Sequence, residues 1–218
     1  MHRLLAPVFA ALLITAACAD DTDDDLATDG DGRTTTNAPT TTSGSTGDAE
    51  LSCSAADVSA DPDEQADLPD PVAVMRQQII NAATACNYDE LEELALQGDS
   101  RFTYSFGEDG DPAEYWRIAE ERHTCGELGA EEHGVLEILA GLLNRPYGVT
   151  DGGDETIYVW PSASTYGSWS EVPAEDQKAL KPLYDEEDFE HFEELFAYIG
   201  YRVGITAAGD WIFFVAGD

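Results

Sequence analysis

The sequence predicts an α+β fold, in which the helices of a single domain pack on a small antiparallel sheet that ends in a C-terminal β-hairpin. The hairpin is indicated by two aromatic and β-branched runs, residues 198–205 and 211–215, separated by the turn-forming residues 206–210. Most apolar residues before the hairpin follow helical spacing, and β-rich runs are few. Helices interspersed with few strands are typical of helices that cover one face of an antiparallel sheet.

Helices are expected where the apolar periodicity coincides with N-terminal signals. Asp70-Pro71 places proline in the first turn of a helix whose residues Val72, Met75 and Ile79 lie on one face. Asp111-Pro112 starts another helix, which carries Trp116, in the same way. The expected helices are 71–86, 89–97, one from residue 111, one at 136–143, 173–180 and 186–196.

Two further strands are expected before the hairpin. Residues 102–106 alternate aromatic and polar side chains and are closed by the turn-rich residues 107–110. Residues 156–160 form a β-branched and aromatic run that Pro161 ends.

The N-terminus reads as a secretory leader. The apolar run 4–17 is shorter than the roughly 20 residues needed to cross a bilayer, and Arg3 precedes it. The run Ile14-Thr15-Ala16-Ala17-Cys18 resembles the lipobox of bacterial lipoproteins. This resemblance implies that the signal peptide 1–17 is removed and that the thiol of Cys18 carries a diacylglyceryl lipid. The protein would then be anchored on the extracytoplasmic side of a bacterial membrane. The alternative is an ordinary signal cut after Ala19, which would release a soluble secreted protein.

Residues 18–70 are predicted to be a disordered, acidic, Ser/Thr-rich linker. Large apolar residues are almost absent there, acids cluster at 20–25, and a Thr/Ser/Gly tract spans 34–47. Such a composition buries too little apolar surface to fold. Residues 71–218 remain for one globular domain.

The charge of the chain excludes one class of partner. Its 45 Asp and Glu residues against 10 Lys and Arg residues give a formal charge of −35. Such a field repels nucleic acid, so no nucleic-acid partner is expected. Lysine is scarce: Lys178 and Lys181 are the only two in the chain.

The candidate ligand-binding residues are Trp160, Tyr166, Trp169 and Arg202. The three aromatic residues follow the strand 156–160 and would stack on a sugar ring or a peptide. Alternatively, Trp160 and Trp169 belong to the core. Arg202, in an otherwise apolar strand, would bind an anionic ligand, pair with a buried carboxylate, or face solvent at a sheet edge.

Three cysteines besides Cys18 are expected to form one disulfide in an oxidising compartment. We favour Cys86 with Cys125, and the alternative is that Cys53 ties the linker to the domain. His123, Cys125 and His133, with Glu131 or Glu132, would offer zinc ligands, but their spacing matches no zinc motif. No metal is therefore predicted, and no cofactor beyond the lipid on Cys18.

No catalytic residue is predicted. The sequence contains no G-x-S-x-G, S-x-x-K, P-loop or dinucleotide-binding glycine pattern. Acid pairs such as Glu186-Glu187 and Glu193-Glu194 read as solvated helix faces.

Several short segments of the domain are similar to a family of uncharacterised bacterial exported proteins. These segments are Phe102-Thr103-Tyr104-Ser105-Phe106-Gly107, Asp111-Pro112 with Tyr115-Trp116, Tyr158-Val159-Trp160-Pro161, Gly200-Tyr201-Arg202-Val203-Gly204, and Phe213 to Asp218. The resemblance implies a single exported domain and no particular chemistry. The helical start followed by a sheet also resembles the cone-shaped folds of the nuclear transport factor 2 type, which is the alternative fold.

The expected function is that of a non-enzymatic, membrane-anchored lipoprotein of the cell envelope. Its lipid would hold the membrane, and its domain would bind an envelope protein, a glycan or a small ligand. The alternative is a cell-envelope hydrolase that acts on glycan or peptide. Paired carboxylates in a cleft beside residues 160–169 would favour the hydrolase, and a filled domain without such a cleft would favour binding.

Overall fold

A computed structural model describes residues 53–98, 102–104, 110–124, 133–153 and 155–217. These residues belong to one compact unit, Asp48–Asp218. The predicted signal peptide, Cys18 and the predicted linker up to residue 52 lie outside the described residues, as does Cys125. Among the helices that are described, none is long and apolar enough to cross a membrane.

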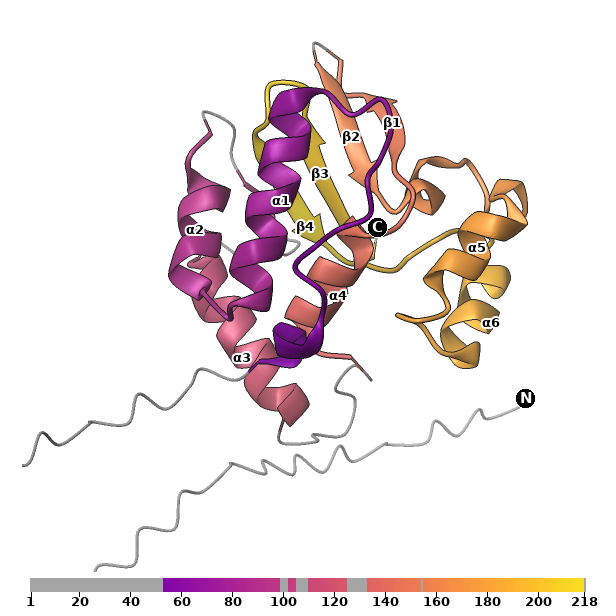
Figure 1. The fold of residues 1–218 in the computed structure, drawn as a ribbon. Helices are drawn as coiled ribbons and strands as arrows, with labels where there is room; N and C mark the ends of the chain where they lie inside the picture. The colour runs from indigo at the N-terminus through magenta and orange to yellow at the C-terminus, as the bar shows by residue number, and fades with distance from the viewer. Residues whose placement is uncertain (1–52, 99–101, 105–109, 125–132, 154, 218) are drawn as a thin grey trace, which may run out of the picture. The chain divides into compact units, whose positions relative to one another are not determined.

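Four helices and a short 3-10 helix form the N-terminal half of the described unit (Figure 1). The 3-10 helix η1 spans Ser54–Asp57, and the helices are α1 (Asp70–Thr84), α2 (Tyr88–Leu96), α3 (Pro112–Thr124) and α4 (Val135–Leu143). Helix α1 begins with proline in its first turn, as expected. The side chain of Asn87 caps α2 by accepting a hydrogen bond from the N–H of Glu90 at 3.2 Å.

The sheet has four antiparallel strands in the order β1-β2-β3-β4. The strands are β1 (Gly148–Asp151), β2 (Thr156–Trp160), β3 (Arg202–Thr206) and β4 (Trp211–Val215). Helices α1 and α4 pack on β3, and α2 packs on β4. The predicted α+β class and the C-terminal hairpin are confirmed. The short edge strand β1 was not predicted, because three of its four residues are exposed and carry no apolar alternation.

The strand predicted at 102–106 is present only as a single bridge in its described part. Thr103 pairs with Phe213 in parallel, through hydrogen bonds from its N–H to Ile212 O at 3.0 Å and from Phe214 N–H to its own carbonyl at 2.9 Å. Phe102 places its ring 4.7 Å from that of Trp211 and 6.0 Å from that of Trp116. The segment therefore attaches an aromatic anchor to the edge of β4.

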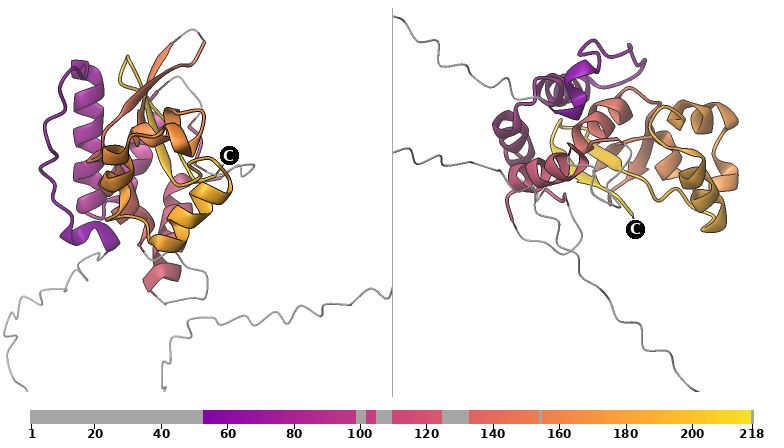
Figure 2. Two further views of the ribbon diagram at one scale, coloured as in Figure 1. Left: turned by 90° about the vertical axis from the view of Figure 1, so that its right-hand side faces the viewer. Right: turned by 90° about the horizontal axis from the view of Figure 1, so that it is seen from below.

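An excursion between β2 and β3 carries two 3-10 helices and two α-helices. These are η2 (Ser162–Thr165), η3 (Trp169–Glu171), α5 (Ala174–Leu180) and α6 (Glu186–Glu194). Asp185 and Asp188 form a capping box at the start of α6. Figures 1 and 2 show α5 and α6 beside the sheet, on the side away from α1 and α2.

The core lies between the helices and the facing side of the sheet. Trp116 on α3 stacks on Trp211 of β4, with ring centroids 5.6 Å apart, and both side chains are buried. Gly204 on β3 permits a close approach on the opposite side, because a Cβ there would overlap the ring of Phe213. Aromatic burial of this kind supplies much of the apolar area of a small domain.

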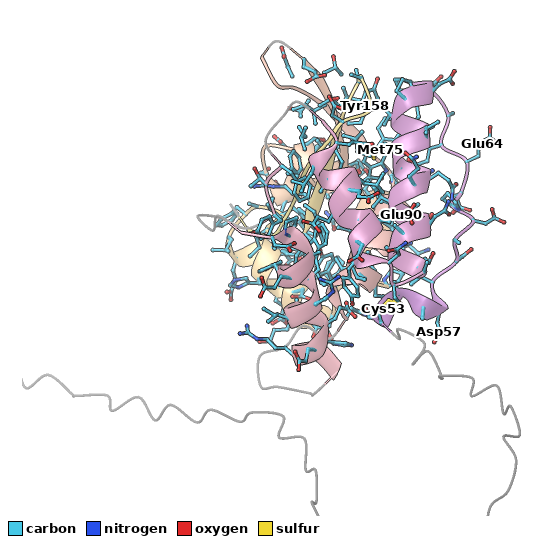
Figure 3. The ribbon with its side chains drawn as sticks, turned by 90° about the vertical axis from the view of Figure 1, so that its left-hand side faces the viewer. Cys53, Asp57, Glu64, Met75, Glu90 and Tyr158 are labelled. Carbon is cyan, nitrogen blue, oxygen red and sulfur yellow. A yellow bond between two sulfur atoms is a disulfide. The ribbon has the colours of Figure 1, made fainter. Side chains whose placement is uncertain are left out.

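The domain begins earlier than the predicted boundary at Pro71. Residues 53–69, which begin with η1, form the N-terminal strap, a segment that runs beside α1; Figure 3 shows Cys53 and Asp57 near one end of that helix and Glu64 along its side. Ala55 is fully buried, and the side chain of Gln65 donates to Arg145 O at 2.7 Å and accepts from Trp160 Nε1 at 3.0 Å. Composition alone concealed this segment, because polar contacts rather than apolar burial hold most of it.

Two links fix the start of the strap. Cys53 forms a disulfide with Cys86, so the favoured pairing of Cys86 with Cys125 is wrong and the alternative role of Cys53 is correct.

Glu120 of α3, only 5% exposed, accepts hydrogen bonds from Ser54 N at 2.8 Å, Ser54 Oγ at 2.7 Å and Leu136 N at 2.8 Å. The buried carboxylate therefore joins the strap to the N-terminus of α4, where negative charge is favourable. Gly134 is required there because a Cβ would overlap Ser54.

Candidate functional site

The aromatic platform predicted from residues 160–169 does not form. Trp160 has 0% and Trp169 has 4% of its surface exposed, because Trp160 packs against Tyr147 and Trp169 packs edge-on against Phe192. Of the three candidates only Tyr166 reaches solvent, with 39% of its surface exposed. Prediction of these two tryptophans as ligand-binding residues was wrong, and the alternative, that they belong to the core, is correct.

Arg202 does not join these aromatic residues in one site. Val203 is paired with Trp160 across β2 and β3, so both lie on one face of the sheet, and Arg202 lies on the other. Arg202 is half-buried, and its charge opposes the rise in the pKa of Tyr198, which burial and the neighbouring Tyr184 hydroxyl raise well above the ordinary value.

The residues considered for zinc are brought together only in part. The imidazole Nδ1 of His133, which precedes α4, lies 3.1 Å from Oε1 of Glu137 in the first turn of that helix. Cys125, Glu131 and Glu132 lie outside the described residues. In the part of the chain that the structure covers, no group of three His, Cys, Asp or Glu side chains is placed to hold a metal ion.

An open groove with a volume of about 880 Å³ lies between α5 and α6. Helix α5 packs on η2, and α6 packs on η3. Four residues of the α5 region and six from the turn and α6 line it: Ala174, Gln177, Lys178 and Lys181; Tyr184, Asp185, Glu186, Phe189, Glu190 and Glu193. The volume lies within the range of pockets that hold small ligands.

Helical periodicity explains why these residues share the groove. Ala174, Gln177, Lys178 and Lys181 follow i, i+3, i+4, i+7 spacing, and Glu186, Phe189, Glu190 and Glu193 repeat that spacing on α6. Each row is therefore one face of a helix. The floor is partly apolar, because Phe189 packs edge-on against the buried Trp169, with ring centroids 5.8 Å apart.

The two lysines of the chain line the same groove wall. Both side chains are exposed, and neither makes a hydrogen bond or an ion pair with any other residue that the structure describes. The opposite wall carries Glu186, Glu190 and Glu193. The groove therefore presents a cationic side and an anionic side to a ligand.

The groove acids are poorly suited to hydrolysis. A general acid at neutral pH needs a carboxyl group shielded from water, which raises its pKa. Asp185, Glu186, Glu190 and Glu193 are all exposed. Glu120, the buried carboxylate, is outside the groove and is occupied by Ser54 and Leu136. Among the acids that line the groove, none is shielded from water in this way.

Sequence reasoning did not identify this groove. The rarity of Lys178 and Lys181 indicates no partner, and the pairs that contain Glu186 and Glu193 are equally typical of a solvated helix face. The available signal was the i, i+3 spacing of the only lysines, one short turn before a helix with acids at i, i+4 and i+7. Comparison of the chain with family models, with curated proteins and with solved structures finds no match.

Proposed function

We propose that this chain is a lipid-anchored binding protein of the bacterial cell envelope, with its domain on the extracytoplasmic side of the membrane. Cys18 carries the lipid, and the acidic residues that follow it separate the domain from the membrane. The resemblance of residues 14–18 to a lipobox supports the anchor. The Cys53–Cys86 disulfide supports the compartment, because structural disulfides persist in oxidising surroundings.

The observation that carries the binding function is the groove between α5 and α6. It is open, it has the volume of a ligand pocket, and its charged side chains are exposed. Exposed charges at a groove provide attraction and orientation for a ligand without the shielded acid that hydrolysis requires. The domain therefore binds a partner or a small ligand in this groove and does not transform it.

The anchor is tested by Cys18→Ala in the native host. The variant should lose labelling by a radioactive fatty acid and appear in the soluble fraction, while the parent stays with the membrane. Continued membrane retention of the variant, with unchanged labelling, would contradict the anchor.

The binding function is tested by a photoreactive amino acid at Gln177, which lines the groove, in the full chain in its host. The matched control is Glu175, an exposed residue of the same helix that is not in the groove lining. We expect a discrete adduct from position 177 that is absent from position 175 and is lost when Lys178 and Glu190 are reversed in charge. Equal adducts from both positions would contradict binding in the groove.

A further inference from the structure

From the charges of the two groove walls, we infer that the ligand is a short zwitterionic peptide, held with a carboxylate toward Lys178 and Lys181 and an ammonium or guanidinium group toward Glu186, Glu190 and Glu193. This inference rests on the proposed binding function and names the chemical class of its ligand.

The requirement for a carboxylate comes from the lysines. In a chain with 45 acidic residues, both lysines remain without an ion pair to the residues that the structure describes. Their place near the C-terminus of α5 is favourable for the helix dipole, and this explains a cation at that end of the helix. The helix dipole does not explain why both lysines lie on the face of α5 that lines the groove, with Ala174 and Gln177, when Glu175 lies outside that lining.

The requirement for a positive group comes from the opposite wall and from the whole molecule. Glu186, Glu190 and Glu193 occupy successive turns of α6 along the groove. The formal charge of −35 repels a purely anionic ligand at long range and attracts one that carries positive charge. A purely cationic ligand that filled the groove would be repelled by Lys178 and Lys181 on the other wall. A ligand with both charges satisfies both walls.

The requirement for a chain of several atoms comes from the size and floor of the groove. A volume of about 880 Å³ exceeds what one free amino acid fills, and Phe189 and Tyr184 give an apolar surface between the charged walls. Aliphatic side chains or methylene groups between the two charges would cover that surface. A peptide of a few residues has this arrangement. Its backbone N–H groups would donate to Oε1 of Gln177, because the Nε2 of that residue already donates to Val172 O at 3.1 Å and to Trp169 O at 3.4 Å.

The experiment is isothermal titration of the full chain with four end-blocked tetrapeptides that differ only in charge: Glu-Ala-Ala-Lys, Glu-Ala-Ala-Glu, Lys-Ala-Ala-Lys and Gln-Ala-Ala-Gln. We expect the zwitterionic peptide to bind about tenfold more tightly than the other three at low salt, and the preference to shrink as salt screens the exposed charges. The double variant Lys178→Gln, Lys181→Gln should weaken its binding roughly two- to tenfold, as should Glu190→Gln. Glu175→Gln and Glu194→Gln are the matched controls, because both residues are exposed and neither lines the groove.

Two outcomes would overturn the inference and separate it from the proposed function. Tightest binding of Lys-Ala-Ala-Lys, strengthened by removal of the lysines, would show a groove that selects cations, and binding there would stand while the zwitterion would be wrong. Absence of binding by all four peptides, with a position-177 adduct still formed in the host, would also leave the groove as a binding site and reject this ligand class.

Discussion

Removal of the Cys53–Cys86 disulfide gives the most quantitative test of the fold. The bond joins residues 33 positions apart, and the chain-entropy relation for a closed loop of that length gives a stabilisation of about 4 kcal/mol. Cys53→Ala is the preferred variant, because Cys53 has an extended backbone that any residue adopts, whereas Cys86 has a φ of 53° just after α1. Equilibrium urea unfolding should therefore show a much lower midpoint for the variant than for the parent.

The assay includes its own controls. With a urea dependence of about 2 kcal/mol per molar, a loss of about 4 kcal/mol lowers the midpoint by roughly 2 M. The reducing agent tris(2-carboxyethyl)phosphine should lower the midpoint of the parent by a similar amount and leave that of the variant unchanged. Mass spectrometry of an unreduced digest should identify peptides joined through Cys53 and Cys86. A midpoint change below about 0.5 M, or peptides joined through Cys86 and Cys125, would refute the reasoning.

Three other substitutions test separate parts of the domain. Glu120→Gln puts an amide NH₂ in place either of the oxygen that accepts from Ser54 N or of the oxygen that accepts from Ser54 Oγ and Leu136 N. Urea unfolding should therefore show a loss of about 1 to 3 kcal/mol, and a neutral result would contradict the link between the strap and α4. Gly204→Ala places a methyl group into the ring of Phe213 and should cost about 1 to 3 kcal/mol in the same assay; an unchanged midpoint would contradict the close approach. Burial, followed by the charge of Glu120, raises the pKa of Tyr88 to about 12, above its ordinary value of 10.0, so its contribution to stability is complete below pH 10 and is lost as the pH rises toward 12. Tyr88→Phe should therefore flatten the alkaline fall in melting temperature, and an identical fall in both proteins would reject that assignment.

Helix positions followed from the sequence because local signals and burial agree there. Proline in the first turn of α1 and the apolar face of α4 each predict a helix that the structure contains. The β4 run of aromatic and β-branched residues behaves in the same way. Where propensity, pattern and packing all favour one structure, a short window of sequence is sufficient.

Long-range polar contacts could not be predicted from the sequence. The N-terminal strap is held by Gln65, Ser54 and the disulfide at Cys53, and their partners lie 33 to 95 positions away. Composition gives no indication of such pairing, and a strap with few apolar residues looks like a linker. Trp160 and Trp169 show the opposite error, because aromatic residues near a loop look available for ligands until the packing of other helices is known.

The groove could be predicted from the sequence only in part. Its two rows of residues follow helical spacing that the sequence displays, but the placement of α5 on η2 and of α6 on η3 decides that the rows face a common space. The sequence shows the lysines and the acids of α6 as two separate rows. It does not give the distance between the two rows in space.

The central claim, that the groove between α5 and α6 binds the ligand, is tested most directly by NMR titration of the ¹⁵N-labelled full chain with the peptide Glu-Ala-Ala-Lys. We predict that the largest amide shifts fall on Gln177, Lys178, Lys181 and Glu190, and that they disappear in the Lys178→Gln, Lys181→Gln variant. Shifts confined to another surface, such as the turn between β1 and β2, or shifts that persist in the variant, would contradict the claim.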